Sequence, residues 1–450
     1  MERLFGTDGI RGVVGDDLTF ALAREVGRAL VQVLSKRAVR KSFILIGMDT
    51  RLSSFTLADS VLLGITDAGG DVVNIDVCPT PAVAYLVKKH NFDAGVMISA
   101  SHNPWEYNGI KIFGSDGFKL SDDLENQIEE IILCNDIPYY FAKERGRIKE
   151  LRNGLNEYID YLIKSSDHLF DGIKIAIDCA NGSAYTTAKT VFEGLGAECF
   201  MLADDPDGMN INRDCGSTHL NALRDLVINN KLNLGIAFDG DADRCLAIDE
   251  NGREVDGDHI LAILGARMKS EGRLRENAIV GTVMTNLGLV RFCEENGIDF
   301  TRARVGDRYV LEELNNKGLS LGGEQSGHII IRDLATTGDG QLTAVALLSC
   351  IKESGKSLGA LADIMKKYPQ YMINLEADSA DKENFKNDSQ IKEIIKESEI
   401  EIAEHGRIII RPSGTEHLIR IMTEGDDPVL AEKICTNLSE KIKKRLNVLK

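Results

Sequence analysis

The sequence lacks the cysteine pattern of a zinc site or of a disulfide-bonded protein. Its nine cysteines are scattered, with no CxxC pair and no tight cluster, so reduced thiols inside a cell are the simpler interpretation. Apolar runs long enough to span a membrane are also missing, and the N-terminal segment MERLFGTDGIRG has no apolar stretch of signal-peptide length. These absences predict a cytoplasmic protein that does not enter membranes.

Basic residues are in the minority, with 53 Lys and Arg against 70 Asp and Glu and a net charge of −17. This balance disfavours general attraction to nucleic acid or to anionic membranes. The GxxxxGK[ST] and GxGxxG motifs are absent, so ATP and NAD are not indicated. No GxSxG elbow occurs either, which disfavours an esterase. An anionic substrate would therefore need a local basic pocket that works against the overall field.

The 450 residues are enough for about three domains at roughly 150 residues each. Apolar periodicity predicts strands alternating with helices in three successive rounds. The first round has strands at 43–47, 71–77 and 94–98 and helices at 19–35, 56–68 and 81–89. After a polar, weakly patterned stretch at 143–170, the second has strands at 173–178, 198–202 and 234–238 and a helix at 219–229. The third has strands at 278–283, 300–305 and 319–322 and helices at 287–295 and 308–315.

This repeat predicts an α/β fold in which three similar domains have mixed, mostly parallel sheets. From about Pro369, a hairpin-like segment RIIIRPSGTEHLIRIMTEG and a final helix predict a smaller C-terminal α+β domain. The expected domains are residues 1–150, 151–254, 255–368 and 369–450. In each of the first three, the most unusual loop follows the third strand. Because ligands bind beyond the carboxyl ends of parallel strands, these loops predict one central cleft.

The loop DGDADR carries three carboxylates, Asp239, Asp241 and Asp243, at alternate positions. Their mutual repulsion is costly unless a cation neutralises it, and hard oxygen ligands favour Mg²⁺ over zinc. A solvated acidic turn is the plain alternative. A calcium-binding EF-hand is a rival, because Glu250 falls at the twelfth position. However, Arg244 stands where that motif requires glycine, and the flanking segments are typical of strands.

The loop SASHNP places Ser101 and His102 just after a buried strand, and the nearby NGIK supplies Lys111. Neighbours in sequence need not be in contact, so this pairing does not establish a hydrolase. A polar loop and a surface lysine are the plain alternatives. Lys111 could offset anionic oxygen or move a proton.

Three further loops suggest phosphate and sugar recognition. RPSGT, with Arg420 following, combines hydroxyls, amides and two guanidinium groups suited to phosphate, where a plain hairpin turn would not explain both arginines. GGEQSGH groups hydrogen-bonding side chains appropriate for sugar hydroxyls, although any flexible loop could look like this. GTDGIRG is a third glycine-rich turn, and it carries Arg11.

Taken in order, GTDGIRG, SASHNP with NGIK, DGDADR, GGEQSGH and RPSGTEHLIR strongly resemble the motifs of the α-D-phosphohexomutase superfamily, from residue 6 to about 425. The resemblance implies that Ser101 is the phosphoserine and also a metal ligand beside Asp239, Asp241 and Asp243. It implies further catalytic residues and a set of substrate-binding residues. The former are Arg11, His102, Lys111, Arg244 and His328, and the latter are Glu324, Ser326, Arg411, Ser413, Gly414, Thr415 and Arg420.

Two positions depart from the superfamily pattern. Ala242 stands where many members have glycine, which matters little if its backbone angles are ordinary. His417 stands where related enzymes usually carry proline, which puts the detailed geometry of the phosphate loop in question.

The implied activity is phosphoryl transfer between O6 and O1 of one sugar through a 1,6-bisphosphate intermediate, an isomerase-class reaction. The segments VDGDHI, VGDRYV, GEQSGH and TTGDG favour glucosamine phosphates, as in cell-wall precursor synthesis. The resemblance also implies one Mg²⁺ per chain, a hexose 1,6-bisphosphate activator, a phosphorylated amino-sugar substrate and a homodimer. The alternatives are action on mannose or glucose phosphates and, from another class, a noncatalytic calcium- or sugar-phosphate-binding protein.

Overall fold

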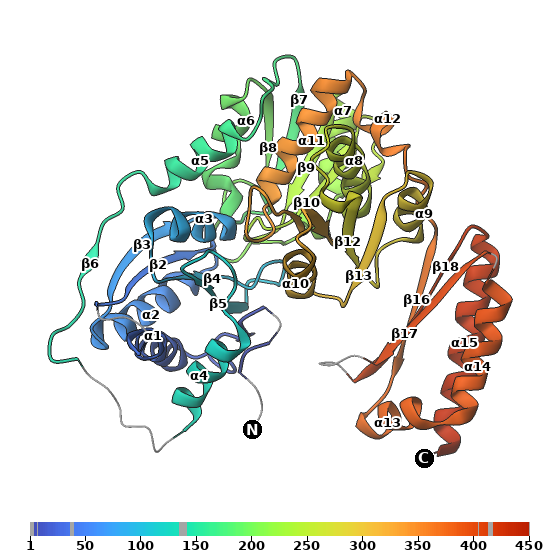
Figure 1. Ribbon diagram of the computed structural model, residues 1–450, viewed down its shortest axis with the longest axis horizontal. Coiled ribbons are helices and arrows are strands. Elements are labelled where there is room, and N and C mark those ends of the chain that lie inside the picture. Colours follow the sequence, from blue (N-terminus) through green and yellow to red (C-terminus); the bar gives the residue numbers. More distant parts are fainter. Residues whose placement is uncertain are drawn as a thin grey trace. The chain divides into compact units, whose positions relative to one another are not determined.

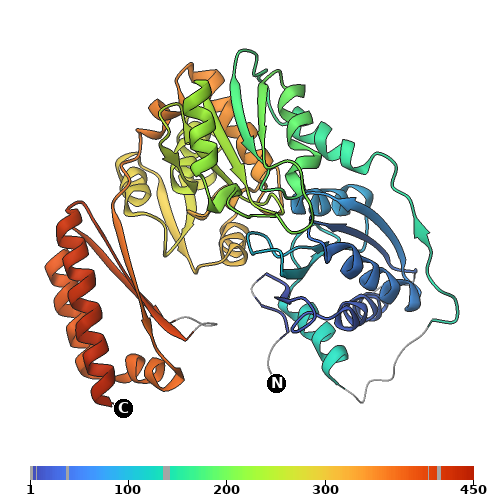
Figure 2. The ribbon, with the colours of Figure 1, turned by 180° about the vertical axis from the view of Figure 1, so that it is seen from behind.

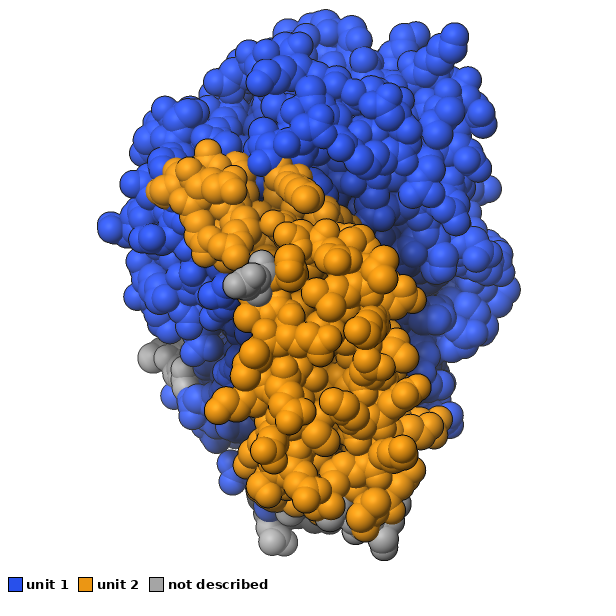
Figure 3. All heavy atoms as spheres, turned by 90° about the vertical axis from the view of Figure 1, so that its right-hand side faces the viewer, with its two compact units in different colours: residues 1–283, 298–364 blue, residues 284–297, 365–450 orange. Residues whose placement is uncertain are grey.

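The computed structural model describes residues 4–6, 8–36, 40–134, 142–403, 405–412 and 417–449. The chain forms two compact units, coloured separately in Figure 3. The first comprises residues 1–283 and 298–364, and the second comprises residues 284–297 and 365–450. None of the helices in the described part of the chain is both long and apolar enough to cross a membrane.

The first sheet of unit 1 has the order β1-β5-β4-β2-β3-β6, with β2 parallel to both β3 and β4 and β5 antiparallel to β4. Figure 1 shows helices on both sides of this sheet. The strands are β1 (Ile10–Val13), β2 (Phe43–Met48), β3 (Asp71–Val77), β4 (Ala94–Ile98), β5 (Tyr107–Gly114) and β6 (Ile148–Lys149). The helices are α1 (Phe20–Ser35), α2 (Ser54–Asp67), α3 (Thr80–His90) and α4 (Asp122–Leu133).

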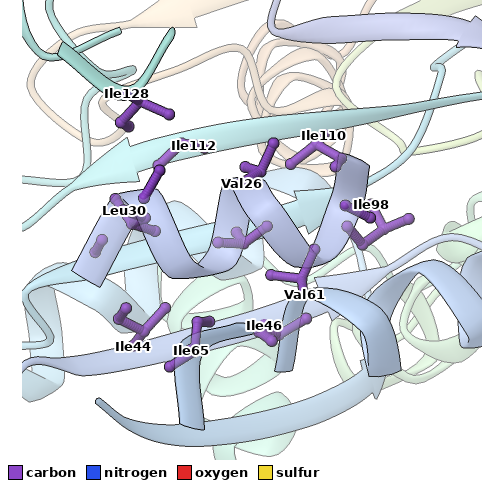
Figure 4. Packing of buried hydrophobic residues seen from close by; sticks show 14 of the residues in the cluster. Val26, Leu30, Ile44, Ile46, Val61, Ile65, Ile98, Ile110, Ile112 and Ile128 are labelled. Atoms are coloured by element: carbon purple, nitrogen blue, oxygen red, sulfur yellow. The ribbon is translucent and has the colours of Figure 1, made fainter. Parts of the chain in front are cut away.

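Alternation along β2 builds two apolar layers, because successive side chains of a strand point to opposite faces. Ile44 and Ile46 belong to the buried cluster that also contains Val61 of α2 (Figure 4). Gly47 faces the other way, and a Cβ built on it would lie 2.6 Å from Cγ2 of Val83 in α3. The predicted alternation of strands and helices thus buries the sheet on both faces.

The second sheet has the order β11-β10-β9-β7-β8. Its strands are β7 (Lys174–Asp178), β8 (Glu198–Leu202), β9 (Leu234–Phe238), β10 (Cys245–Asp249) and β11 (Glu254–Val255), and its helices are α6 (Ala188–Gly194) and α7 (Asn221–Asn230). The stretch 143–170 was expected to be weakly patterned, but it contains α5 (Gly154–Lys164). Tyr158, Ile159 and Leu162 are buried at helical spacing, so this expectation was wrong.

The third sheet has the order β13-β12-β14-β15. Its elements are α8 (Gly257–Ser270), β12 (Ala278–Thr282), β13 (Asp299–Ala303), α10 (Asp307–Lys317), β14 (Leu321–Gly323), β15 (Ile329–Ile331), α11 (Gly340–Ser354) and α12 (Leu358–Ala362). All three sheets share one motif. A central strand (β2, β7 or β12) lies between two parallel neighbours, and one of these neighbours (β4, β9 or β14) pairs with an antiparallel strand that follows it in sequence. The predicted repeat is confirmed.

The second unit contains a three-stranded antiparallel sheet of order β16-β18-β17 that packs on helices (Figures 1 and 2). β17 and β18 form the predicted hairpin. Contacts also assign α9 to this unit. Its elements are α9 (Leu287–Glu295), β16 (Gln370–Glu376), α13 (Ser379–Asn387), α14 (Ser389–Ile402), β17 (Gly406–Pro412), β18 (Leu418–Gly425) and α15 (Pro428–Leu449). The predicted α+β character is confirmed, whereas the limits of the four domains stay a prediction.

Candidate active site

The three unusual loops of unit 1 occupy equivalent places in the three sheets. The loop with Ser101 joins β4 to β5, the loop with Asp239 joins β9 to β10, and the loop with Glu324 joins β14 to β15. Each follows the carboxyl end of a parallel strand, where ligands bind in such sheets. Hydrogen bonds and ion pairs between these loops bring their side chains into one site.

Ser101 is the centre of this site. Its side chain is 1% exposed, and its hydroxyl donates a hydrogen bond to Oδ2 of Asp239 at 2.5 Å. Its backbone has φ +54°, in the left-handed region that L-residues rarely adopt. Strain of this kind persists only where the surrounding contacts impose it.

Those contacts come from residues that the sequence reasoning missed. The Ser101 carbonyl accepts hydrogen bonds from Nη2 of Arg51 and Nδ2 of Asn212, each at 2.9 Å. Asp49 holds Arg51 at 2.8 Å and accepts the Ser99 hydroxyl at 2.7 Å, while Ser99 in turn accepts the Ser101 N–H at 2.9 Å. One signal was available, because Asp49 and Arg51 directly follow the predicted strand at 43–47.

Asp239, Asp241 and Asp243 form a buried carboxylate cluster, with ligand atoms that all lie within 4.8 Å of one another. Lys111, which is 1% exposed, donates to Oδ2 of Asp241 at 2.7 Å and to Oδ2 of Asp243 at 3.3 Å. Thr80 donates its hydroxyl to Asp241 at 2.5 Å. The structure therefore gathers Ser101, the three aspartates and Lys111 at one point.

The carboxylates differ in their electrostatics. Burial, and then the neighbouring Asp243 and Asp241, raise the pKa of Asp239 well above its usual range. Burial alone would also raise the pKa of Asp243, but Lys111 and His328 hold it well below its usual range. Burial lowers the pKa of Lys111, and the surrounding carboxylates more than reverse this effect, so the ammonium stays charged.

The cluster fits a hard divalent cation. It offers only oxygen atoms as ligands, and Oδ1 of Asp241 is buried without a hydrogen bond from any described residue. Repulsion from Asp243 and Asp241 adds to the effect of burial on the pKa of Asp239, and a bound cation would offset that repulsion. The flanking elements are strands, and Glu250 instead accepts the N–H of Gly359 at 3.0 Å, which argues against an EF-hand.

The backbone angles of Ala242 are not ordinary, so the condition under which this alanine would matter little is not met. Its φ is +59°, a region that favours glycine, so the alanine carries backbone strain. Its carbonyl accepts the N–H of Gly340 at 3.0 Å, a contact that helps to hold this conformation.

Arg11 and Arg244 border the same cluster. Arg11 forms an ion pair with Asp8, and Nε of Arg244 lies 3.9 Å from Oδ2 of Asp239. Both Nε atoms are buried and donate no hydrogen bond to any residue in the described part of the chain. Each guanidinium therefore has donor capacity left for an anionic ligand.

Asp8 belongs to a second ionic network, which the sequence did not reveal. It contacts Lys111 at 3.1 Å, and Lys119 bridges it to Asp307 at the start of α10. This network connects the GTDGIRG turn with the third sheet's domain inside unit 1.

The two histidines have opposite electrostatics. Nδ1 of His102 lies 3.4 Å from the Ser101 hydroxyl oxygen, and burial together with Arg244 and Arg11 lowers the pKa of His102 to about 4. Burial would lower the pKa of His328 too, but Asp243 and Asp307 raise it to about 9. The Gly338 N–H donates to Nε2 of His328 at 3.1 Å, a bond that favours the neutral ring and so opposes the effect of the two aspartates.

The loop that was predicted to recognise the sugar lies beside the cluster. Glu324 accepts the N–H of Gly306 at 3.0 Å, and its charge acts on Arg244. Ser326 is partly exposed on the same loop.

The predicted phosphate loop belongs to the second unit. Arg411 and Arg420 are direct cross-strand partners on β17 and β18, so the hairpin places the two arginines opposite each other on neighbouring strands. Ser413, Gly414 and Thr415 lie outside the described residues. His417 is described, and its carbonyl accepts the N–H of Ala377 at 2.9 Å. That these residues join Ser101 in one cleft stays a prediction.

Four family models match successive parts of the chain. Phosphoglucomutase/phosphomannomutase alpha/beta/alpha domain I matches residues 2–137, domain II matches residues 156–252 and domain III matches residues 256–368. The C-terminal domain of the same family matches residues 372–441. The matches therefore extend over most of the chain.

Curated relatives are similar along their whole length. The chain is 50% identical over 452 residues to a phosphoglucosamine mutase of Caldicellulosiruptor saccharolyticus, covering 99% of this chain and 100% of the relative. It is 46% identical over 449 residues to a phosphoglucosamine mutase of Clostridium novyi, with the same coverage.

Solved structures share the fold at lower identity. A phosphoglucomutase/phosphomannomutase family protein from Burkholderia thailandensis matches with a TM-score of 0.82 and 22% identity, covering 99% of this chain and 97% of that one. An Aspergillus fumigatus N-acetylphosphoglucosamine mutase, solved with GlcNAc-6P and magnesium, matches with a TM-score of 0.69 and 15% identity, covering 98% and 95%. The chain belongs to the phosphoglucomutase/phosphomannomutase family.

Proposed function

We propose that this protein is an isomerase-class phosphohexomutase that interconverts glucosamine 6-phosphate and glucosamine 1-phosphate. The observation that carries the substrate is the identity of about half of the residues, over the full chain, to enzymes named phosphoglucosamine mutase. The chemistry rests on the buried Ser101 hydroxyl beside the aspartate cluster.

Ser101 carries the phosphoryl group in this proposal. The bond between Oγ of phosphorylated Ser101 and phosphorus breaks, and a bond forms from phosphorus to the free sugar hydroxyl, giving a 1,6-bisphosphate. The bisphosphate reorients, and its other phosphoryl group returns to Ser101. Each transfer moves one proton between sugar oxygen and Oγ, and His102 is placed to carry it, because its Nδ1 lies 3.4 Å from Oγ.

Asp239, Asp241, Asp243 and the Ser101 group would hold one Mg²⁺. When bound, this ion offsets negative charge on the transferring group. Lys111 keeps the carboxylates in register through its bonds to Asp241 and Asp243. The unused donors of Arg11 and Arg244 are available to phosphate oxygens. Hexose 1,6-bisphosphate would act as activator, because it can phosphorylate Ser101.

Glu324 and Ser326 are proposed to bind the sugar hydroxyls or the amine, and the Arg411–Arg420 pair to bind the distal phosphate. The phosphorylated amino sugar is thus the partner that the site supports. The homodimer implied by the resemblance and the cytoplasmic location predicted from the sequence stay predictions.

The decisive experiment compares turnover of glucosamine 6-phosphate, glucose 6-phosphate and mannose 6-phosphate by the full chain with Mg²⁺ and a bisphosphate activator. We expect the highest kcat/KM on glucosamine 6-phosphate. A higher kcat/KM on mannose 6-phosphate or glucose 6-phosphate would refute glucosamine 6-phosphate as the preferred substrate, but the protein would still be a phosphohexomutase.

A second measurement separates a mutase from a noncatalytic binding protein. Incubation with ³²P-labelled bisphosphate should label the wild type, and Ser101→Ala should acquire no label and show no turnover. Labelling of Ser101→Ala, or activity near that of the wild type, would refute the carrier role.

Arg420→Ala tests the phosphate loop. Loss of a charge-assisted hydrogen bond to phosphate should raise KM by about tenfold with a small effect on kcat. Lys433→Ala, which removes an exposed cation from α15 of the same unit, is the matched control. An unaltered KM in Arg420→Ala would defeat the assignment.

A further inference from the structure

The segment TTGDG, residues 336–340, follows β15 and ends at the first residue of α11, and the proposed reaction makes no use of it. Its backbone nevertheless contacts two parts of the site. The Gly338 N–H lies 3.1 Å from Nε2 of His328, and the Gly340 N–H donates to the carbonyl of Ala242 at 3.0 Å. Ala242 stands between two of the three clustered aspartates. One short segment therefore touches both a basic side chain and the metal loop.

These contacts are close because the segment has no side chain where it meets the site. A Cβ on Gly338 would lie 2.4 Å from Nε2 of His328, and a Cβ on Gly340 would lie 2.3 Å from the carbonyl oxygen of Arg244. A backbone this near transmits displacements of a few tenths of an ångström directly to the imidazole and the aspartate loop.

Packing alone does not hold the segment in place. A cavity of about 380 Å³ lies against it, lined by Thr336, Thr337 and Asp339 together with Tyr85 and Tyr161. The side chain of Asp339 is fixed by hydrogen bonds instead. Its Oδ1 accepts the N–H of Leu342 at 2.9 Å, capping α11, and its Oδ2 accepts the hydroxyl of Tyr158 at 2.9 Å.

Tyr158 comes from α5, the helix that precedes the second sheet. Its side chain is fully buried, so its hydroxyl has to find a partner within the protein. The partner is Asp339, 181 positions further along the chain. This hydrogen bond joins the second sheet's domain to the segment that contacts His328 and Ala242.

We propose that Tyr158 and Asp339 are positioning residues, whose hydrogen bond sets the His328 ring and the aspartate loop through the backbone of residues 336–340. Neither residue contacts the reacting groups. The inference rests on the proposed function for what those groups do, but the effect on cation binding is independent of substrate.

Two conservative variants isolate this bond. Tyr158→Phe removes only the hydroxyl, and Asp339→Asn keeps an oxygen that can cap α11. In each variant, we expect kcat to fall about tenfold with a small change in KM, and the dissociation constant for Mn²⁺ to rise about tenfold. The double variant should resemble Tyr158→Phe, because both lack the hydroxyl, whereas in Asp339→Asn an amide nitrogen replaces the oxygen that accepts from that hydroxyl.

Mn²⁺ affinity is measured on the free protein by electron paramagnetic resonance, and the ¹⁵N shifts of the His328 ring are followed by NMR. Tyr161→Phe is the matched control, because it removes a hydroxyl on the same helix that donates to the carbonyl of Leu334, two residues before the segment, at 2.6 Å. This control should retain the kcat, Mn²⁺ affinity and His328 shifts of the wild type.

Wild-type Mn²⁺ affinity and His328 shifts in Tyr158→Phe would overturn the proposal, whatever happens to thermal stability. Equal losses in Tyr161→Phe would also overturn it, because they would indicate a general effect of domain packing. If the wild type turned over none of the hexose phosphates, the proposed function would fail, and the Mn²⁺ and NMR series would still decide this inference. If Asp339→Asn did not fold, Tyr158→Phe and its control would decide it.

Discussion

Single residues in this site carry backbone constraints that their side chains do not reveal. Ser101 and Ala242 both have positive φ, although neither is glycine. Gly240, two residues before Ala242 in the sequence, lies close to Ser101, because a Cβ on it would be 2.6 Å from the carbonyl oxygen of Ser101. The loop of the proposed phosphoserine and the metal loop are therefore in backbone contact at this glycine.

This contact predicts opposite outcomes for two small substitutions. Gly240→Ala should displace the Ser101 loop and lower kcat by at least about 100-fold, since misplacement by about 1 Å has effects of that size. Ala242→Gly should relieve strain and keep turnover near that of the wild type, with unfolding free energy changed by less than about 1 kcal/mol. Steady-state kinetics and urea denaturation check both, and a fully active Gly240→Ala variant would contradict the close approach.

A buried aspartate away from the cluster predicts a pH dependence of stability. Burial raises the pKa of Asp178 from its ordinary 3.8 to about 6, against the opposing hydrogen bonds from Gly216 and Ala180. The folded protein therefore binds this proton more tightly than the unfolded chain does. Asp178 contributes stability that is fully present below pH 3.8 and is lost as the pH rises through about 6.

The measurement compares urea unfolding of the wild type and Asp178→Asn, which has no carboxyl to titrate. Between pH 7 and pH 4, the unfolding free energy of the wild type should rise relative to that of the variant by up to about 3 kcal/mol. A difference that stays constant over this range would show that the carboxyl does not titrate as described.

At the scale of elements, the close crossing of α1 and α2 depends on two glycines. A Cβ on Gly64 of α2 would lie 1.9 Å from the carbonyl oxygen of Arg24 in α1, and a Cβ on Gly27 of α1 would lie 2.3 Å from that of Val61 in α2. The helices cover the same face of the first sheet, and their apolar side chains pack with those of its strands in one buried cluster (Figure 4).

Gly64→Ala should therefore lower the unfolding free energy by about 3 kcal/mol, because backbone on both sides must move to admit a methyl group. Gly265→Ala in α8 is a matched control. There the added methyl meets the end of the Ile279 side chain, which can rotate, and alanine favours the helix. Equal losses in the two variants, measured by urea denaturation, would refute the argument from helix contact.

At the scale of the whole molecule, we expect cation binding and folding to be coupled. In the folded protein, Lys111 of β5 holds Asp241 of the cluster by a hydrogen bond, and the unfolded chain lacks this arrangement of ligands. Mg²⁺ at about 100 times its dissociation constant should raise the unfolding free energy by about 2.7 kcal/mol relative to protein in EDTA.

Asp241→Asn should remove most of this increment, whereas Glu250→Gln should retain it. Glu250 would be a ligand only in an EF-hand, and its carboxylate instead binds Ser357 and Gly359. Calorimetry with Mg²⁺ and with EDTA distinguishes the aspartate site from an EF-hand. Loss of the Mg²⁺-dependent stabilisation in Glu250→Gln would overturn the aspartate site.

Local pattern was sufficient to predict much of this molecule. Strands at 71–77, 94–98, 198–202 and 234–238 agree with the structure at both ends, because apolar runs bounded by polar turns specify buried strands. The loops after the third strands could also be predicted as one group, since equivalent places in a repeat lie at equivalent edges of their sheets. The helix α5 was missed because its buried face, with Tyr158 and Leu162, is short and its surroundings are polar.

The sequence by itself thus determined which elements form and which loops carry the chemistry, because these depend on side chains a few positions apart. The tertiary structure alone decided which distant groups meet. Lys119 contacts Asp307, which is 188 positions away in the sequence, Arg51 donates to the carbonyl of Ser101, and Tyr158 donates to Asp339. Such pairs leave no periodic pattern in the sequence. The arrangement of the sheets in the folded protein brings the paired atoms within hydrogen-bonding distance, whatever the spacing of the two residues along the chain.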